Sequence, residues 1–120
     1  MAADEFAERL ELVRKRFAAK LPGRLDDIDA SLVQLTGEAA DIGHSVYSTH
    51  RKVHDLCGIG PTLGFHSIGK AARTCERILL QPSRGQRGLT EQELAQLKEG
   101  LAALRVTAMD EIRSTGPVPE

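Results

Sequence analysis

The chain has 120 residues, with 16 basic and 17 acidic side chains and a formal net charge of -1. This length accommodates one modest hydrophobic core, so we expect a single domain over residues 1–120, ordered from about 4 to 113, with a flexible tail at 114–120. The balanced charge argues against a nucleic-acid partner, because nucleic-acid-binding domains usually display clustered positive charge.

The N-terminal sequence is charged from its first turn onward and contains no long apolar run. It therefore predicts neither a signal peptide nor a membrane span, and we expect a cytoplasmic location without membrane association. In a reducing compartment the two cysteines, Cys57 and Cys75, are expected to be free thiols.

Apolar residues recur at alternating three- and four-residue steps, which is typical of helices with one buried face, and no segment shows the alternation of a strand. The first predicted helix carries the stripe Phe6, Leu10, Val13 and Phe17, and the second carries Leu25, Ile28, Leu32 and Leu35. Between them, Pro22 and Gly23 are predicted to interrupt or restart the helix.

Three further helices are predicted in the remainder of the chain. Their stripes are Ile42, Val46, Thr49, Val53 and Leu56, then Phe65, Ile68, Ala72, Cys75 and Leu79, and finally Leu94, Leu97, Leu101, Leu104 and Ala108. The segment 81–88, "QPSRGQRG", is predicted to be a loop. The last helix has the clearest start, because Thr90 and Glu93 have the spacing of a capping box and Leu89 and Leu94 that of a hydrophobic staple.

Five amphipathic segments of this length must bury their stripes against one another. The predicted fold class is therefore all-α: an antiparallel up-down four-helix bundle with an additional N-terminal helix packed alongside or across one end. Because the bundle would use every stripe, we expect a monomer.

His54, on the third predicted helix, is the main candidate for a functional residue. On an ideal helical wheel it lies roughly 120° from the centre of the apolar stripe, so it should be at least partly exposed, with Tyr47 and His50 on the same flank. Gly58 follows one turn later. A glycine inside a helix costs roughly 1 kcal/mol relative to alanine. Either access to the His54 ring or close packing of helices would explain the glycine at position 58. Close packing would equally explain Gly64 and Gly69.

The pattern of His54, Leu56 and Gly58, with Gly64 after five intervening residues, resembles the phosphoacceptor motif of histidine phosphotransfer (HPt) domains of bacterial two-component phosphorelays. The amphipathic start at residues 6–28 and the helix beginning at Phe65 also look like those domains. The resemblance extends over about residues 6–112.

The resemblance implies that His54 accepts a phosphoryl group from the receiver domain of a hybrid histidine kinase and passes it to the receiver of a response regulator. Gly58, Gly64 and Tyr47 would lie where the receiver docks. A neutral imidazole is a competent nucleophile at neutral pH. The receiver would supply the magnesium ion, so the chain needs no cofactor of its own. No nucleotide-binding loop or other catalytic motif is present, which predicts a phosphocarrier and not an enzyme.

The chain departs from the family at one position of the motif. Most members carry a lysine just before the first glycine, where this chain has Cys57. The positive charge near the phosphoryl group would then be weaker, or would come from Arg51 on the same helix or from Lys70 and Arg73 on the next one.

Two other interpretations remain open. The first is a docking bundle that binds a receiver or a kinase without being phosphorylated, which the missing lysine favours. Alternatively, His50, His54 and Cys57 stand at i, i+4 and i+7 and line one helix face, as zinc ligands do. No fourth ligand is fixed by the sequence, although His44 or His66 could serve, and we therefore predict no metal site.

Overall fold

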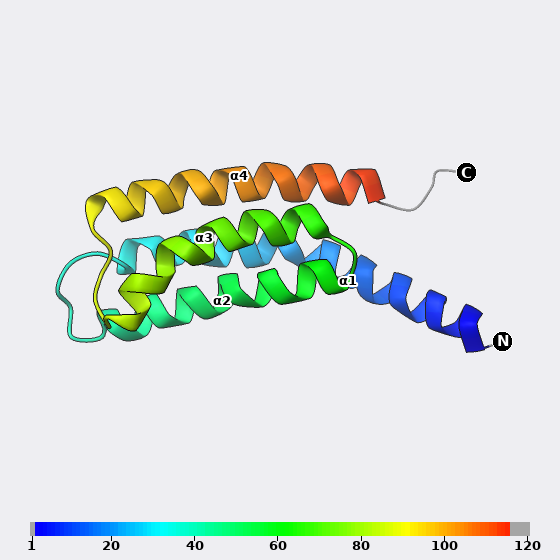
Figure 1. Cartoon of the computed structure of the whole chain (residues 1–120), viewed down its shortest axis with the longest axis horizontal. Helices are drawn as coiled ribbons and strands as arrows, with labels where there is room; N and C mark the ends of the chain where they lie inside the picture. Colours follow the sequence, from blue (N-terminus) through cyan, green and yellow to red (C-terminus); the bar gives the residue numbers. More distant parts are fainter. Residues whose placement is uncertain (1, 116–120) are drawn as a thin grey trace.

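The computed structural model describes residues 2–115, and all regular structure in that range is helical. Four α-helices follow one another, α1 (Ala2–Ser31), α2 (Ile42–Thr62), α3 (His66–Arg84) and α4 (Glu91–Thr115), with a short 3-10 turn η1 (Leu32–Gln34) after α1. They pack into an elongated molecule of 56 × 25 × 19 Å (Figure 1). The all-α prediction is confirmed, while most of the predicted flexible tail, residues 116–120, lies outside the described residues.

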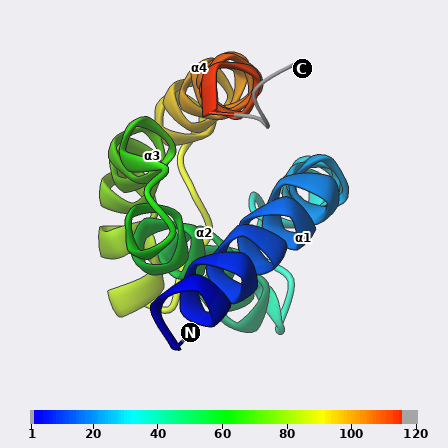
Figure 2. The same cartoon turned by 90° about the vertical axis from the view of Figure 1, so that its right-hand side faces the viewer.

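The apolar stripes meet in one core. Consecutive helices are neighbours and α1 also contacts α4, so that each helix touches two others (Figure 2). The largest fully buried apolar side chains come from all four helices and the segment after α1, and include Leu21, Ile28, Leu35, Leu56, Ile68, Leu79, Leu97 and Leu104. Within the described range, no helix has the length and apolar content needed to cross a bilayer.

Pro22 lies inside α1, so the predicted interruption and the separate N-terminal helix are wrong. A proline removes one backbone donor and usually weakens a helix interior. Here Leu21, Leu25 and Ile28 continue one buried face through the proline, and this packing maintains the helix across it. The two predicted helices are a single helix of 30 residues.

The first half of α1 extends beyond the end of α2 (Figure 1). The sequence predicts its stripe to be buried, but Phe6 is 69%, Leu10 37% and Val13 46% exposed. Only Phe17 is buried, and its ring stacks on Phe65 with centroids 5.6 Å apart. Because an exposed stripe remains on α1, the reasoning that predicted a monomer does not hold for this helix.

A tight turn joins α2 to α3. Gly64 has a φ of +91°, the left-handed conformation that glycine adopts at little cost. The Phe65 N–H donates to the Gly60 carbonyl at 2.8 Å. A Cβ at Gly69 would lie 2.4 Å from Cγ of Pro61, so α2 and α3 approach too closely there for any side chain. Packing therefore explains Gly69, whereas the turn itself explains Gly64.

α3 continues to Arg84, so the predicted loop at 81–88 is wrong at its start. Pro82 is buried in the last turn of the helix, where packing again outweighs the breaking tendency of proline. The predicted start of α4 is confirmed. The Thr90 N–H donates to Glu93 Oε1 at 2.9 Å, and the Glu93 N–H donates to Thr90 Oγ1 at 3.1 Å, which completes a capping box.

Polar contacts fix α4 to two other helices. The Glu111 carboxylate accepts hydrogen bonds from the Ser67 and Ile68 N–H groups, at 3.0 and 2.8 Å, and so caps the first turn of α3. Arg105 reaches Asp26 and Asp29 of α1 at 2.9 and 2.7 Å. These contacts hold α3 and α1 in place against α4.

Candidate functional site

His54 lies in the middle of α2 with its imidazole turned away from the core. Its neighbours Val53 and Leu56 are fully buried and fix which face of the helix points inward. The His54 side chain is 59% exposed, as the helical wheel predicts. A reactive ring nitrogen at this position is open to a partner from solution.

A carboxylate from α3 holds the His54 ring. Nδ1 of His54 hydrogen-bonds to Oε2 of Glu76. Partial burial tends to raise the pKa of Glu76, but its hydrogen bond and charge interaction with His54, aided by Cys57 and His50, bring that pKa below its ordinary value. An ionised carboxylate can only accept, so Nδ1 carries the proton and Nε2 of a neutral His54 keeps its lone pair.

The sequence pattern did not identify Glu76. The residue stands eleven positions after Phe65, and His54 stands eleven positions before it. Because Gly64 and Phe65 form the turn of a helical hairpin, positions equally distant from the turn come to lie opposite each other. Recognition of Gly64 as the turn glycine would have been the signal that placed Glu76 beside His54.

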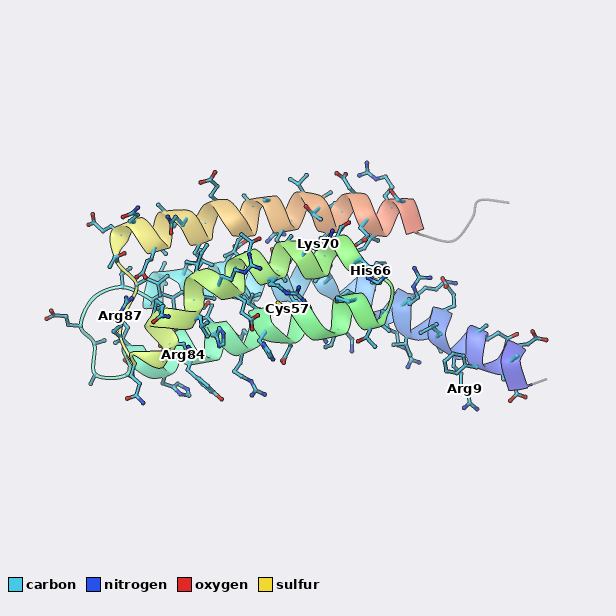
Figure 3. The ribbon with its side chains drawn as sticks, viewed as in Figure 1. Arg9, Cys57, His66, Lys70, Arg84 and Arg87 are labelled. Carbon is cyan, nitrogen blue, oxygen red and sulfur yellow. The ribbon has the colours of Figure 1, made fainter. Side chains whose placement is uncertain are left out.

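Cys57 faces the same carboxylate. It lies half-buried on the side of α2 toward α3 (Figure 3). Burial, together with the charge of Glu76 and a hydrogen bond to it, raises the pKa of the Cys57 thiol to about 12, an effect that Arg73 partly offsets. The thiol is therefore protonated at neutral pH and donates to Glu76. Of the basic residues considered as replacements for the missing lysine, Arg73 acts on Cys57, Arg51 acts on His50, and Lys70 is exposed on α3.

His50 completes the group around Glu76. Its side chain is only 15% exposed, and its Nε2 lies 3.7 Å from Oε2 of Glu76, beyond hydrogen-bonding distance. This buried Nε2 has no hydrogen-bond partner among the described residues. Burial lowers the pKa of His50, with help from His54, Arg51 and Arg84, although Glu76 opposes the change. His50 is consequently neutral at neutral pH.

An open groove lies beside the exposed ring. It has a volume of about 440 Å³ and is lined by Val13, His54, Asp55, Gly58, Ile59, Thr62 and Leu63. No described atom would lie within 4 Å of a Cβ on Gly58, so close packing does not explain this glycine. The access explanation fits the geometry, because any larger side chain would project into the groove next to His54.

Two predicted docking residues do not join this groove. Tyr47 is exposed two turns earlier on α2 and lines a separate hollow with His44, Ser83 and Gln86. Gly64 lies at the turn, where its backbone conformation accounts for it. The structure thus brings together His50, His54, Cys57, Gly58 and Glu76, and leaves Tyr47 apart.

The alternative of a metal site finds little geometric support. In the described part of the chain, no group of three or more His, Cys, Asp and Glu side chains has the arrangement to hold a metal ion. His66 begins α3 ten residues before Glu76, about 15 Å along the helix, and so stands too far away to be a fourth ligand.

Comparison of the chain with models of protein families, with curated proteins and with solved structures gives no match.

Proposed function

We propose that this chain is a histidine phosphotransfer protein of a multistep two-component relay, with Nε2 of His54 as the phosphoacceptor. The observation that supports this best is the exposed imidazole whose Nδ1 is held by a carboxylate beside an open, apolar groove. With this function we propose an antiparallel up-down four-helix bundle, a cytoplasmic location and a role as phosphocarrier without catalytic activity of its own.

The geometry suits an in-line transfer. The lone pair on Nε2 attacks the phosphorus of an aspartyl phosphate, the bond from phosphorus to the aspartate oxygen breaks, and its electron pair returns to that carboxylate. The product is a phosphorylated imidazole that still carries the Nδ1 proton and therefore bears positive charge on the ring. Glu76 stabilises this charge through the hydrogen bond it already makes. Transfer to the second receiver reverses these steps.

Magnesium would be held by the partner. Phosphoryl transfer depends on positioning and on neutralisation of the transferred charge. In this proposal the receiver domain contributes the metal ion and the acidic pocket, while the chain contributes one oriented ring. The receiver domains of a hybrid histidine kinase and of a response regulator are accordingly the proposed partners.

The exposed stripe of α1 supports the same partner. Val13 lines the groove next to His54, and Leu10 and Phe6 continue the apolar surface along α1. A domain that approaches His54 over Gly58 would cover this stripe. We therefore assign the stripe to a receiver and not to a second copy of the chain, and propose a monomer, which light scattering at working concentration would check.

The test is transfer of labelled phosphate from receiver domains of the same organism, charged with acetyl phosphate and magnesium. Wild type should become labelled, and His54→Gln should not. Glu76→Gln should react about tenfold more slowly, because a neutral amide stabilises the positive charge of the phosphorylated ring less than a carboxylate does. His44→Gln, at an exposed histidine on the same helix, should match wild type. Equal labelling of His54→Gln and wild type would overturn the proposal.

A docking module that is never phosphorylated is the second candidate. The observation that favours it is the pair of Cys57 and Glu76, which places a negative charge and no lysine next to the acceptor ring. In that case a receiver should bind with the same affinity to wild type and His54→Gln, and neither protein should be labelled. Calorimetry alongside the transfer assay separates the two functions.

A further inference from the structure

His50 has no role in the transfer chemistry described above, yet its side chain is largely buried beside the acceptor. Its Nε2 is shielded from solvent and unpaired among the described residues. The atom faces Oε2 of Glu76 at 3.7 Å, the same oxygen that accepts the hydrogen bond from His54. The two imidazole rings lie 6.1 Å apart, one turn from each other on α2.

Because both rings face Oε2 of Glu76, His50 and His54 compete for a hydrogen bond to the same oxygen. Neutral His50 makes no hydrogen bond to the carboxylate, which is left to Nδ1 of His54. Protonated His50 would carry a charged N–H directed at Glu76. The present distance of 3.7 Å exceeds that of a normal hydrogen bond by less than about 1 Å, so a small shift of the side chain would form the bond. A charge-assisted bond of this kind is stronger than one between neutral groups.

We propose that His50 is a positioning residue that controls the tautomer of His54 through Glu76. Neutral His50 leaves the carboxylate to His54 and keeps the proton on Nδ1, so that Nε2 is nucleophilic. Protonated His50 withdraws the carboxylate and allows the proton of neutral His54 to reside on Nε2, which then has no lone pair to attack phosphorus. The effect of His50 on phosphoryl transfer rests on the proposed function, whereas the effect of His50 on the tautomer of His54 does not.

The surroundings of His50 set where this change occurs. Glu76 on α3 favours the protonated ring, whereas His54 and Arg51 on α2, Arg84 on α3, and burial disfavour it. The balance lowers the pKa of His50, so the site is in its active arrangement at neutral pH and changes only on acidification. The inference therefore predicts an acid-sensitive acceptor.

The experiment is imidazole nitrogen NMR on the purified protein from about pH 8 to about pH 5, the interval in which histidines titrate. In wild type, the share of neutral His54 protonated on Nδ1 should fall in step with protonation of His50. In His50→Leu that share should stay constant over the same interval. His50→Gln, which keeps a polar but non-titrating side chain, serves if the leucine variant does not fold. His44→Leu should follow wild type.

Transfer rates provide the second readout. The rate of His50→Leu divided by that of wild type should be near one at neutral pH and rise at least about twofold at the acid end. Tautomer shares that are identical in wild type and both His50 variants at every pH would overturn the inference. If the His54 tautomer follows His50 protonation in a protein that never becomes labelled, the inference about His50 is supported and the proposed phosphotransfer function is overturned. If the protein becomes labelled but the His54 tautomer does not follow His50, the proposed function is supported and the inference about His50 is overturned.

Discussion

Gly58 stands one turn after His54, and its position opens onto the groove without contacting another helix. Gly58→Gln should keep the stability of the protein or raise it by up to about 1 kcal/mol, because glutamine favours a helix more than glycine does. The same side chain would stand between His54 and an approaching receiver, so transfer should slow at least about tenfold. Melting temperature and transfer rate, measured on one preparation, check both effects.

Gly69 provides the matched control for this variant. A Cβ there would lie 2.4 Å from Pro61, so Gly69→Ala should destabilise the fold by about 1–3 kcal/mol, as overpacking usually does. A Gly58→Gln protein that is destabilised in the same way, with normal specific transfer, would show that Gly58 serves packing and not docking.

Cys57 occupies the position at which the resembled family usually has lysine. Cys57→Lys should place a positive charge between Glu76 and the phosphoryl group, and we expect a phosphorylated fraction equal to or above that of wild type, by up to about fivefold for a contribution near 1 kcal/mol. The half-buried position is compatible with a lysine stem that leads its amine outward. Quantification of labelled protein at equilibrium checks the effect.

The outcome that contradicts this expectation is a folded Cys57→Lys protein, verified by circular dichroism, with a lower phosphorylated fraction than wild type. The amine would then be pairing with Glu76 and taking that carboxylate away from His54. Cys57→Ser, which keeps a small hydroxyl donor without the charge, is the control for loss of the thiol alone.

At the scale of a helix, the start of α4 illustrates what local sequence controls. Bidentate hydrogen bonds from Arg87, and those from Thr90, hold the pKa of Glu93 at about 2 despite partial burial. A carboxyl whose pKa is lowered by folding stabilises the fold above its ordinary pKa, and this contribution disappears as the pH falls toward 2. Glu93→Gln should therefore cost about 1 kcal/mol at neutral pH, because glutamine can still cap the helix but lacks the charge that pairs with Arg87.

The difference in unfolding free energy between wild type and Glu93→Gln should shrink toward zero on acidification from about pH 5 to about pH 2. Urea denaturation at a series of pH values measures it. Glu99→Gln, at an exposed position of the same helix, is the control for loss of one acidic side chain and should change the unfolding free energy at neutral pH by less than about 0.5 kcal/mol. A constant cost for Glu93→Gln at all pH values would contradict the role of the ionised carboxylate in its pair with Arg87.

The structural features that could be predicted from the sequence are those determined by residues close together in the chain. The cap at Thr90 and Glu93 depends on neighbours three residues apart, and it is confirmed. The break at Pro22 was wrong because burial of Leu21 and Leu25 against other helices outweighs the proline, which no local pattern reveals. Glu76 could not be found for the same reason, since its position beside His54 depends on how two helices align across a turn.

The exposed stripe of α1 predicts where a receiver binds. Leu10→Asp and Val13→Asp remove apolar surface that contacts solvent, so the melting temperature should change little, whereas receiver affinity should fall about tenfold or more. Calorimetric titration with a receiver domain measures the affinity. Val106→Asp, at an exposed apolar residue of α4, is the control and should bind as wild type does.

Taken as a whole, the molecule divides into a helical pair that carries the site and two helices that brace it. His54 and Glu76 belong to α2 and α3, and their alignment depends on the close contact of Gly69 with Pro61. Glu111 of α4 caps the first turn of α3 and holds the pair from outside. Damage to this brace is thus expected to disturb the acceptor ring without touching it.

The projecting half of α1 has a thermodynamic consequence for binding. A helix of this length without tertiary partners is only marginally stable in water. Amide hydrogens at residues 6–15 should exchange much faster than those at residues 18–31, which lie on the packed half of α1. Mass spectrometry of exchanging protein checks this, and equal protection of both halves would contradict it.

A receiver that covers the exposed stripe of α1 must first suppress this fraying, and the entropy lost on ordering the helix lowers the affinity of the receiver. The resulting complex would be short-lived, which suits a carrier that has to leave one receiver before it can meet the next.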